Sequence, residues 1–204
     1  VSTAALPWLT GTSVNPLLRA AHLALQGYPV SLVLPWVVPD QQPILFPAGV
    51  RFDAPAEQEE WLRAWLRRAG FADGPLGANL TFRWYDALYV DKLGSLIQRR
   101  GVDVTQVVPP AERDVAILEE PEHLNWFHHG EQWTRAYAHV VGVLHTNYGY
   151  YALYEQREGG VGPAHPRAPA ASSLQLTRKL PPVLRHAPPR VGRRPALART
   201  PSSN

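Results

Sequence analysis

The 204-residue chain contains neither cysteine nor methionine. Without cysteine, disulfide bonds and thiolate metal sites are excluded, and folding does not depend on an oxidising compartment. The missing methionine leaves the sequence, which starts at Val1, without an initiator, and this indicates a processed chain or a fragment. No apolar run approaches the roughly 20 residues of a membrane-spanning helix, and no signal peptide is visible. We therefore expect no integral membrane segment in this sequence.

Charge and proline are unevenly distributed along the chain. Residues 157–204 contain nine Lys or Arg and one acid, a net charge of +8, whereas residues 1–156 contain 11 basic and 16 acidic residues, a net charge of −5. The basic segment also holds nine of the 21 prolines and has little apolar periodicity. Such a segment cannot bury enough apolar surface to offset its ordering entropy. We predict a folded domain at 1–156 and a basic, Pro/Arg/Ala-rich disordered tail at 157–204.

Short apolar runs alternate with amphipathic stretches along residues 1–156. The start of the chain is typical of the last residues of a strand running into a loop, followed by a helix with Asn15 as N-cap and Pro16 in its first turn. Further helices are expected at 56–69 and 89–101, and strands at 30–34, 50–52, 80–85, 114–118 and 139–144. This alternation predicts an α/β, Rossmann-like, mainly parallel sheet with helices on both faces.

Polar side chains follow the last two predicted strands. Glu119, Glu120, Glu122 and His123 come directly after 114–118, and 139–144 leads into His145 and Asn147. Parallel sheets bind ligands outside the carboxyl ends of their strands, so these clusters predict a ligand site. The loop Thr10-Gly11-Thr12 precedes a helix and could hold phosphate or sugar hydroxyls, although an ordinary strand-to-helix turn explains it as well.

Three interpretations of these clusters stay open. His and carboxylate side chains suit divalent metal ions, but none of them forms a pair at i and i+4 on a predicted helix, which disfavours a metal site. Carboxylates, imidazoles, Asn and Trp can instead hydrogen-bond sugar hydroxyls and cover the face of a pyranose ring. Alternatively, individual residues such as Glu119 or His123 cap or hydrogen-bond a neighbouring loop.

Four long strings carry a resemblance to a known family. They are LPWLTGT at 6–12, NPLLRAA at 15–21, LEEPEHLNWFHHG at 118–130 and VLHTNY at 143–148. These strings closely resemble the plant and algal digalactosyldiacylglycerol synthases, and the match covers most of residues 1–156. A shared Rossmann pattern alone would not produce strings of this length.

The resemblance implies a retaining glycosyltransferase of the GT-B type, which has two Rossmann-like domains facing a cleft. Such enzymes transfer galactose from UDP-galactose to monogalactosyldiacylglycerol, bound peripherally at the chloroplast outer envelope membrane. The chain resembles the N-terminal, acceptor-side domain, and nothing in it resembles the family's donor-binding domain. The resemblance thus implies a fragment that is inactive alone, with UDP-galactose as substrate, no separate cofactor, no metal and no nucleic-acid partner.

The resemblance also suggests roles for individual residues. His145 is similar to the family's cleft histidine, which hydrogen-bonds the transferred sugar, while the leaving phosphate takes the acceptor proton. Thr10, Gly11 and Thr12 resemble the loop near the donor phosphates. Glu119, Glu120, Glu122, His123 and Asn147 are then expected to contact substrate. The alternative hypothesis is a non-catalytic, lipid- or protein-binding α/β module whose basic tail touches an anionic membrane.

Overall fold

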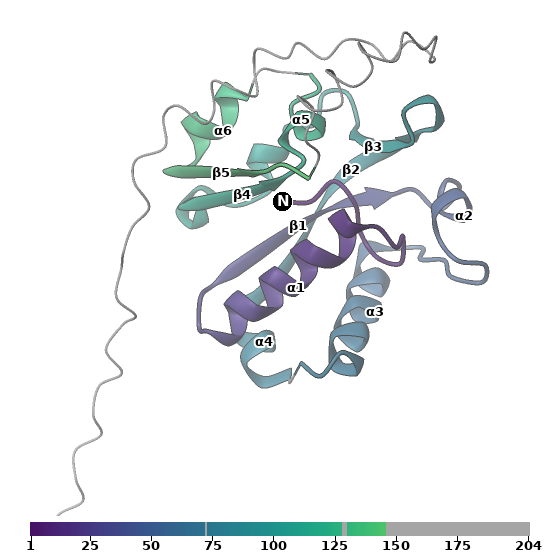
Figure 1. The fold of residues 1–204 in the computed structure, drawn as a ribbon, viewed down its shortest axis with the longest axis horizontal. Helices are drawn as coiled ribbons and strands as arrows, with labels where there is room; N and C mark the ends of the chain where they lie inside the picture. Colours follow the sequence, from purple (N-terminus) through teal and green to yellow (C-terminus); the bar gives the residue numbers. More distant parts are fainter. Residues whose placement is uncertain (72, 128–129, 146–204) are drawn as a thin grey trace, which may run out of the picture. The chain divides into compact units, whose positions relative to one another are not determined.

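The computed structural model describes residues 1–71, 73–127 and 130–145, which all belong to one compact unit, Val1–His165. Figure 1 shows the arrangement of its helices and strands. The predicted boundary between residues 156 and 157 and the predicted tail lie outside the described residues, as does Asn147. Everything that follows concerns the described part of Val1–His165.

Most strand pairs in the described ranges are parallel. β1 (Val30–Val37) pairs in parallel with β2 (Leu80–Val90), and β4 (Val115–Glu119) pairs in parallel with β5 (His139–Val143). β2 also pairs with the antiparallel edge strand β3 (Ser95–Gln98). The prediction of a mainly parallel α/β sheet is confirmed. The strands predicted at 30–34, 80–85, 114–118 and 139–144 are present, and the first two of them, β1 and β2, extend further than predicted.

The first residues of the chain connect the two groups of strands. The backbone nitrogen of Ser2 donates to the carbonyl of Val33 at 2.9 Å, on β1. On the other side, the Val1 nitrogen donates to the Ile117 carbonyl at 2.8 Å, and the Glu119 nitrogen donates to the Val1 carbonyl at 3.0 Å. This is the bonding pattern of a parallel ladder. The carboxyl ends of β1, β4 and β5 therefore lie along the same edge as the loop that follows Ser2.

Helices cover both faces of this layer, as predicted (Figure 1). α1 (Gly11–Leu25), α3 (Pro55–Arg68) and α4 (Asp73–Asn79) pack on one face, where Leu32 and Leu34 of β1 are buried. The intervening Val33 points to the opposite core, which contains residues of α5 (Pro121–Leu124) and α6 (Glu131–Ala136). This alternation is the period of two that a strand buried on both faces requires.

The first helix begins one turn earlier than predicted. Its N-cap is Thr10, not Asn15, and Pro16 lies inside the helix. Proline has no N–H to donate to the carbonyl four residues earlier, which belongs to Thr12. The hydroxyl of Ser2 donates to that carbonyl instead. A side chain from a distant part of the backbone thus repairs the missing helical bond, which no local pattern reveals.

The predicted helix at 89–101 is wrong, because β2 continues to Val90 and turns back into β3. A short 3-10 turn at Asp91–Leu93 leads to Gly94, whose φ of 59° is left-handed and favours glycine. Leu96 of β3 then pairs with Tyr89 across the hairpin. The pattern of apolar residues is compatible with a helix, but the long free edge of β2 offers a better partner.

The predicted strand at 50–52 is also absent from the described chain. The side-chain amide of Gln42, at the start of the short helix α2 (Gln42–Leu45), takes the place of a strand partner. Its Oε1 accepts from the Phe52 backbone nitrogen at 2.8 Å, and its Nε2 donates to the Phe52 carbonyl at 2.9 Å. The backbone of Phe52 is thus satisfied without a sheet.

Candidate functional site

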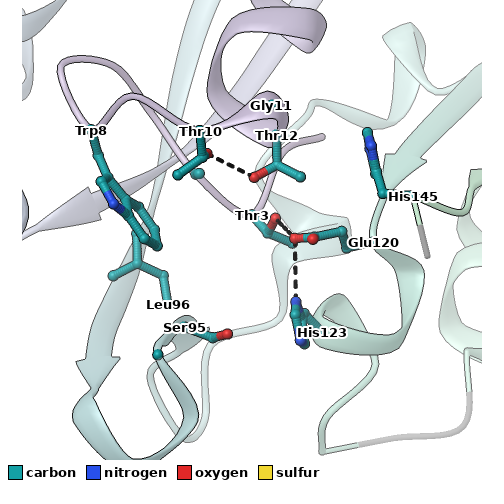
Figure 2. A pocket seen from close by; sticks show the side chains of 12 residues that line it. Thr3, Trp8, Thr10, Gly11, Thr12, Ser95, Leu96, Glu120, His123 and His145 are labelled. Carbon is teal, nitrogen blue, oxygen red and sulfur yellow. Dashed lines mark hydrogen bonds and ion pairs between the residues drawn. The ribbon is translucent and has the colours of Figure 1, made fainter. Parts of the chain in front are cut away.

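A cavity of about 310 Å³ lies at the carboxyl edge of the parallel strands (Figure 2). Its walls come from the segment after Ser2, the N-terminus of α1, the β2–β3 hairpin, the β4–α5 turn and His145, which follows β5. The lining residues are Thr3, Ala4, Trp8, Thr10, Gly11, Thr12, Gly94, Ser95, Leu96, Glu120, His123 and His145. The topology therefore gathers side chains that are more than 130 residues apart in sequence.

The N-terminus of α1 forms one wall of this cavity. Thr10 is the N-cap, and Gly11 and Thr12 are the first two helical residues rather than a loop. The hydroxyls of Thr10 and Thr12 lie 3.0 Å apart and point toward the cavity in Figure 2. The first backbone N–H groups of a helix carry partial positive charge and lack intrahelical partners. Together they form a wall suited to phosphate or hydroxyl oxygens.

A strained turn brings Glu120 into the opposite wall. Glu120 lies between β4 and α5 with φ 47° and ψ 62°, a left-handed conformation that costs a residue other than glycine on the order of 1–2 kcal/mol. Its Oε2 accepts a hydrogen bond from the Thr3 hydroxyl and lies 3.3 Å from Nδ1 of His123. Figure 2 shows the carboxylate between these two partners. The turn thus aims a carboxylate and an imidazole at the same space.

The surroundings favour the charged forms of Glu120 and His123. Burial by itself raises the pKa of Glu120, but hydrogen bonds from His123 and Thr3 and the charge of His123 hold this pKa below its ordinary value. The hydrogen bond to Glu120 raises the pKa of His123 against the effect of burial, and the charges of Glu120 and Glu122 add to the rise. The two side chains form a hydrogen-bonded carboxylate–imidazole pair at the cavity wall, in which each partner favours the charged form of the other.

Glu119 points in the opposite direction, as strand alternation requires. It is 1% exposed and does not line the cavity. Its Oε1 accepts a hydrogen bond from Nη1 of Arg19 on α1, and its Oε2 lies 2.6 Å from Nε2 of His145. The imidazole of His145 therefore joins the cavity surface to a buried ion pair behind it.

The structure brings together most of the predicted site residues. Of the predicted set, Thr10, Gly11, Thr12, Glu120, His123 and His145 line the cavity. Glu119 lies behind its wall, Glu122 is half-buried on α5 next to His123, and Asn147 falls outside the described residues. The roles suggested for these residues stay predictions.

Sequence reasoning missed Thr3, Trp8, Arg19, Ser95 and Leu96. Ser95 and Leu96 were assigned to a helix, so their place beside the parallel edge could not be inferred. Trp8 packs edge-on against Tyr89, with ring centroids 6.2 Å apart, and this contact also depends on the unpredicted hairpin. For Arg19, the sequence shows only a cation on a predicted helix, and its partner Glu119 lies 100 residues further along the chain.

The described residues contain neither a metal-binding cluster nor a membrane-spanning helix. Among them, no group of three or more His, Asp or Glu side chains is arranged to hold a metal ion. None of the helices in the described ranges is both long and apolar enough to cross a membrane.

The fold and the cavity define a class: a Rossmann-like α/β domain with a polar cavity at the carboxyl edge of its parallel strands. No family model matches the chain. It is similar, however, to chloroplastic digalactosyldiacylglycerol synthase 1 of Glycine max, with 43% identity over 158 residues, which cover 76% of this chain and 19% of the relative.

Other curated relatives agree with this match. Chloroplastic digalactosyldiacylglycerol synthase 1 of Arabidopsis thaliana is 42% identical over 158 residues, again 76% of this chain and 19% of the relative. The Lotus japonicus synthase 2, also chloroplastic, is 41% identical over 157 residues, which cover 76% of this chain and 32% of the relative. The resemblance predicted from the sequence is confirmed, and the chain spans about a fifth to a third of the length of the curated relatives it matches.

Proposed function

We propose that this chain is the acceptor-side part of a galactolipid glycosyltransferase located in the chloroplast. The proposed enzyme transfers galactose from UDP-galactose to monogalactosyldiacylglycerol with retention of configuration. It is of the GT-B type and is bound peripherally at the outer envelope membrane. Support comes from relatives that are named chloroplastic digalactosyldiacylglycerol synthases and share 41–43% identity over 76% of the chain.

The observation that carries this proposal is the convergence of separate sequence strings on one cavity. Thr10 and Thr12 come from the first shared string, Glu120 and His123 from the third, and His145 from the fourth. The cavity volume of about 310 Å³ lies at the lower end of the usual range for small-ligand sites. This volume suits a sugar headgroup, and the polar walls suit its hydroxyls.

Each wall has a task in the proposed reaction. The N-terminus of α1, with Thr10 and Thr12, faces the phosphates of the donor, because a helix N-terminus favours anions. Glu120 and His123 orient hydroxyls of the acceptor sugar, one as an acceptor and the other as a donor of hydrogen bonds. His145 hydrogen-bonds the galactosyl group in transit. In this scheme the leaving phosphate takes the acceptor proton, so no protein base is required.

The proposal is tested in a chimera, because the donor half of the cleft is expected to lie in the rest of the relatives' length. Residues 1–145 replace the residues aligned with them in the Arabidopsis thaliana synthase 1, and galactose transfer from UDP-galactose to monogalactosyldiacylglycerol is measured. His145→Ala should lower kcat/KM by a factor on the order of 10²–10³, the scale of one lost hydrogen bond that stabilises developing charge, with little change in melting temperature.

The matched control is His139→Ala, at the amino end of the same strand and exposed to solvent. This variant should transfer galactose like the unaltered chimera. The 204-residue chain alone should bind the galactolipid but should not transfer galactose to it. An active isolated chain would show that the donor site is misplaced, whereas an inactive chimera that still binds the galactolipid would favour the non-catalytic binding module.

A further inference from the structure

The ion pair of Glu119 with Arg19 lies behind the cavity wall, and the proposed reaction gives it no role. Glu119 ends β4 with 1% exposure, and its backbone nitrogen is fixed by the Val1 carbonyl at 3.0 Å. Each carboxylate oxygen has its own partner: Oε1 accepts from Arg19, and Oε2 faces Nε2 of His145 at 2.6 Å. A carboxylate whose two oxygens are both held, on a backbone that is itself fixed, cannot turn toward the cavity to meet a substrate.

Arg19 balances the charge of this carboxylate. A guanidinium is always protonated and only donates hydrogen bonds. The Arg19 side chain is 36% exposed, so it connects the buried carboxylate to solvent from the side of α1. The negative charge of Glu119 is therefore matched without a charge on His145. In a neutral imidazole, the ring nitrogen that faces a carboxylate carries the proton, because two acceptors cannot share a hydrogen bond.

We propose that Glu119 is a positioning residue that fixes His145 as the Nε2-protonated tautomer and leaves Nδ1 to accept a hydrogen bond in the cavity. This assignment rests on the proposed function for the nature of the ligand. A nitrogen that accepts selects a group that donates, and a sugar hydroxyl is such a group. Glu119, which was predicted to contact substrate, then acts on it only through His145.

The proposal makes a specific statement about the isosteric variant Glu119→Gln. Arg19 can only donate, so the introduced amide must turn its oxygen toward Arg19. The amide nitrogen then faces Nε2 of His145 and donates to it. Nε2 must lose its proton, and the hydrogen moves to Nδ1. The substitution should therefore invert the tautomer while it preserves the shape of the side chain.

The test is two-bond ¹H–¹⁵N NMR on the 204-residue chain, which distinguishes protonated from bare ring nitrogens. The unaltered protein should show His145 with a proton on Nε2, and Glu119→Gln should show it on Nδ1. Glu120→Gln is the matched control, because the neighbouring carboxylate contacts Thr3 and His123 instead. It should leave the tautomer of His145 unchanged. A melting curve of each variant confirms that it is folded.

A double variant tests the role of Arg19 in this inversion. In Arg19→Leu combined with Glu119→Gln, the introduced amide is free to turn its oxygen toward His145, and the Nε2-protonated form should return. A proton on Nδ1 in the unaltered chain, or an unchanged tautomer in a folded Glu119→Gln variant, would overturn the proposal. If Glu119→Gln does not fold, the unaltered chain decides: a proton on Nε2 of His145 supports the proposal, and a proton on Nδ1 overturns it.

Activity separates this inference from the function on which it rests. In the chimera, Glu119→Gln should lower kcat/KM by about 10- to 100-fold, the scale of losing a residue that orients a functional histidine. Combining it with His145→Ala should give no loss beyond that of His145→Ala alone, because both act through one imidazole. If the tautomer inverts but neither substitution changes transfer, the positioning role stands and the galactosyl-transfer site is misassigned.

Discussion

The layer of helices and the cavity edge belong to the same folded unit, but different interactions hold each of them together. In the helical layer, α1, α3 and α4 bury aliphatic side chains such as Leu17, Leu62 and Leu66 against β1 and β2. At the cavity edge, the contacts of Glu119 and Glu120 are hydrogen bonds and ion pairs. Apolar burial is not directional, whereas charge pairs fix individual atoms. Stability and site geometry should therefore respond to different substitutions.

α1 belongs to both regions. One face of the helix buries Leu17, Ala20 and Ala24 in the helical layer. Its N-terminus lines the cavity, and Arg19 holds the buried carboxylate of Glu119. The packing of the apolar face therefore sets the position of two parts of the site. A substitution can separate the two roles only if it leaves the helix in place.

The largest expected effect on stability comes from the helical layer. Leu62→Ala removes a side chain that is 1% exposed and leaves a cavity against α1 and β1, so the free energy of unfolding should fall by about 2–5 kcal/mol. Chemical denaturation of the 204-residue chain measures this. The matched control is Leu25→Ala, whose side chain is 39% exposed at the end of α1 and should cost much less. Equal losses in both variants would contradict the assignment of this core.

The second expected effect on the free energy of unfolding is smaller and comes from the hydrogen bond between Thr3 and Glu120 at the cavity edge. Thr3 is 4% exposed and its hydroxyl donates to the Glu120 carboxylate, so Thr3→Val should lower the free energy of unfolding by about 1.5–3 kcal/mol near neutral pH. This bond helps to lower the pKa of Glu120, so its contribution is present above the carboxyl's ordinary pKa and is lost as the pH falls through the lowered value.

Thr81→Val is the control for this second prediction, because Thr81 is exposed on β2. It should change stability by less than about 0.5 kcal/mol, with no pH dependence. Denaturation of both variants at neutral and acidic pH separates the outcomes. A loss for Thr3→Val that stays the same at both pH values would mean that the stabilising effect of the hydroxyl does not depend on the charge of the Glu120 carboxylate.

The comparison also shows which parts of the protein could be predicted from the sequence. Elements of the helical layer follow local patterns: α3 repeats Leu62 and Leu66 at helical spacing, and α1 stops before Gly27, whose φ is 90°. The position of the site followed from a topological rule, since polar residues after parallel strands meet at one edge. This rule brought Glu120, His123 and His145 together, whereas the place of Thr10, Gly11 and Thr12 in the same cavity was suggested only by the loop before a helix and by the family resemblance.

The remaining features depend on contacts between distant segments. Strand β3 forms because the edge of β2 is free, and this preference outweighs the helical pattern of 89–101. Ser2 stabilises the early start of α1 from outside the helix. Neighbouring residues Glu119 and Glu120 look alike in the sequence, yet strand alternation and the left-handed turn at Glu120 send one inward and the other into the cavity. Hydrogen-bond partners of Glu119 and Glu120 such as Arg19 and Thr3 lie far away in the sequence, so the spacing of residues does not reveal them.

The smallest expected effect concerns the pH dependence of the cavity edge. The hydrogen bond to Glu120 and the charge of its carboxylate raise the pKa of His123, so Glu120→Gln should lower this pKa toward its ordinary value of 6.5. NMR titration of the His123 ring protons measures the change. Glu131→Gln, which removes an exposed carboxylate paired with Arg135 on α6, is the control and should leave the His123 titration unchanged.

The same variant has a defined effect on stability. Glu120 has a lowered pKa, so its contribution appears above its ordinary value of 4.5 and is lost as the pH falls through the lowered value. His123 has a raised pKa, so its contribution is complete below 6.5 and is lost as the pH rises through the raised value. The difference in unfolding free energy between the unaltered chain and Glu120→Gln should therefore be largest between pH 4.5 and 6.5 and decline on both sides. A difference that grows steadily toward alkaline pH would show that His123 is not the partner that stabilises the Glu120 carboxylate.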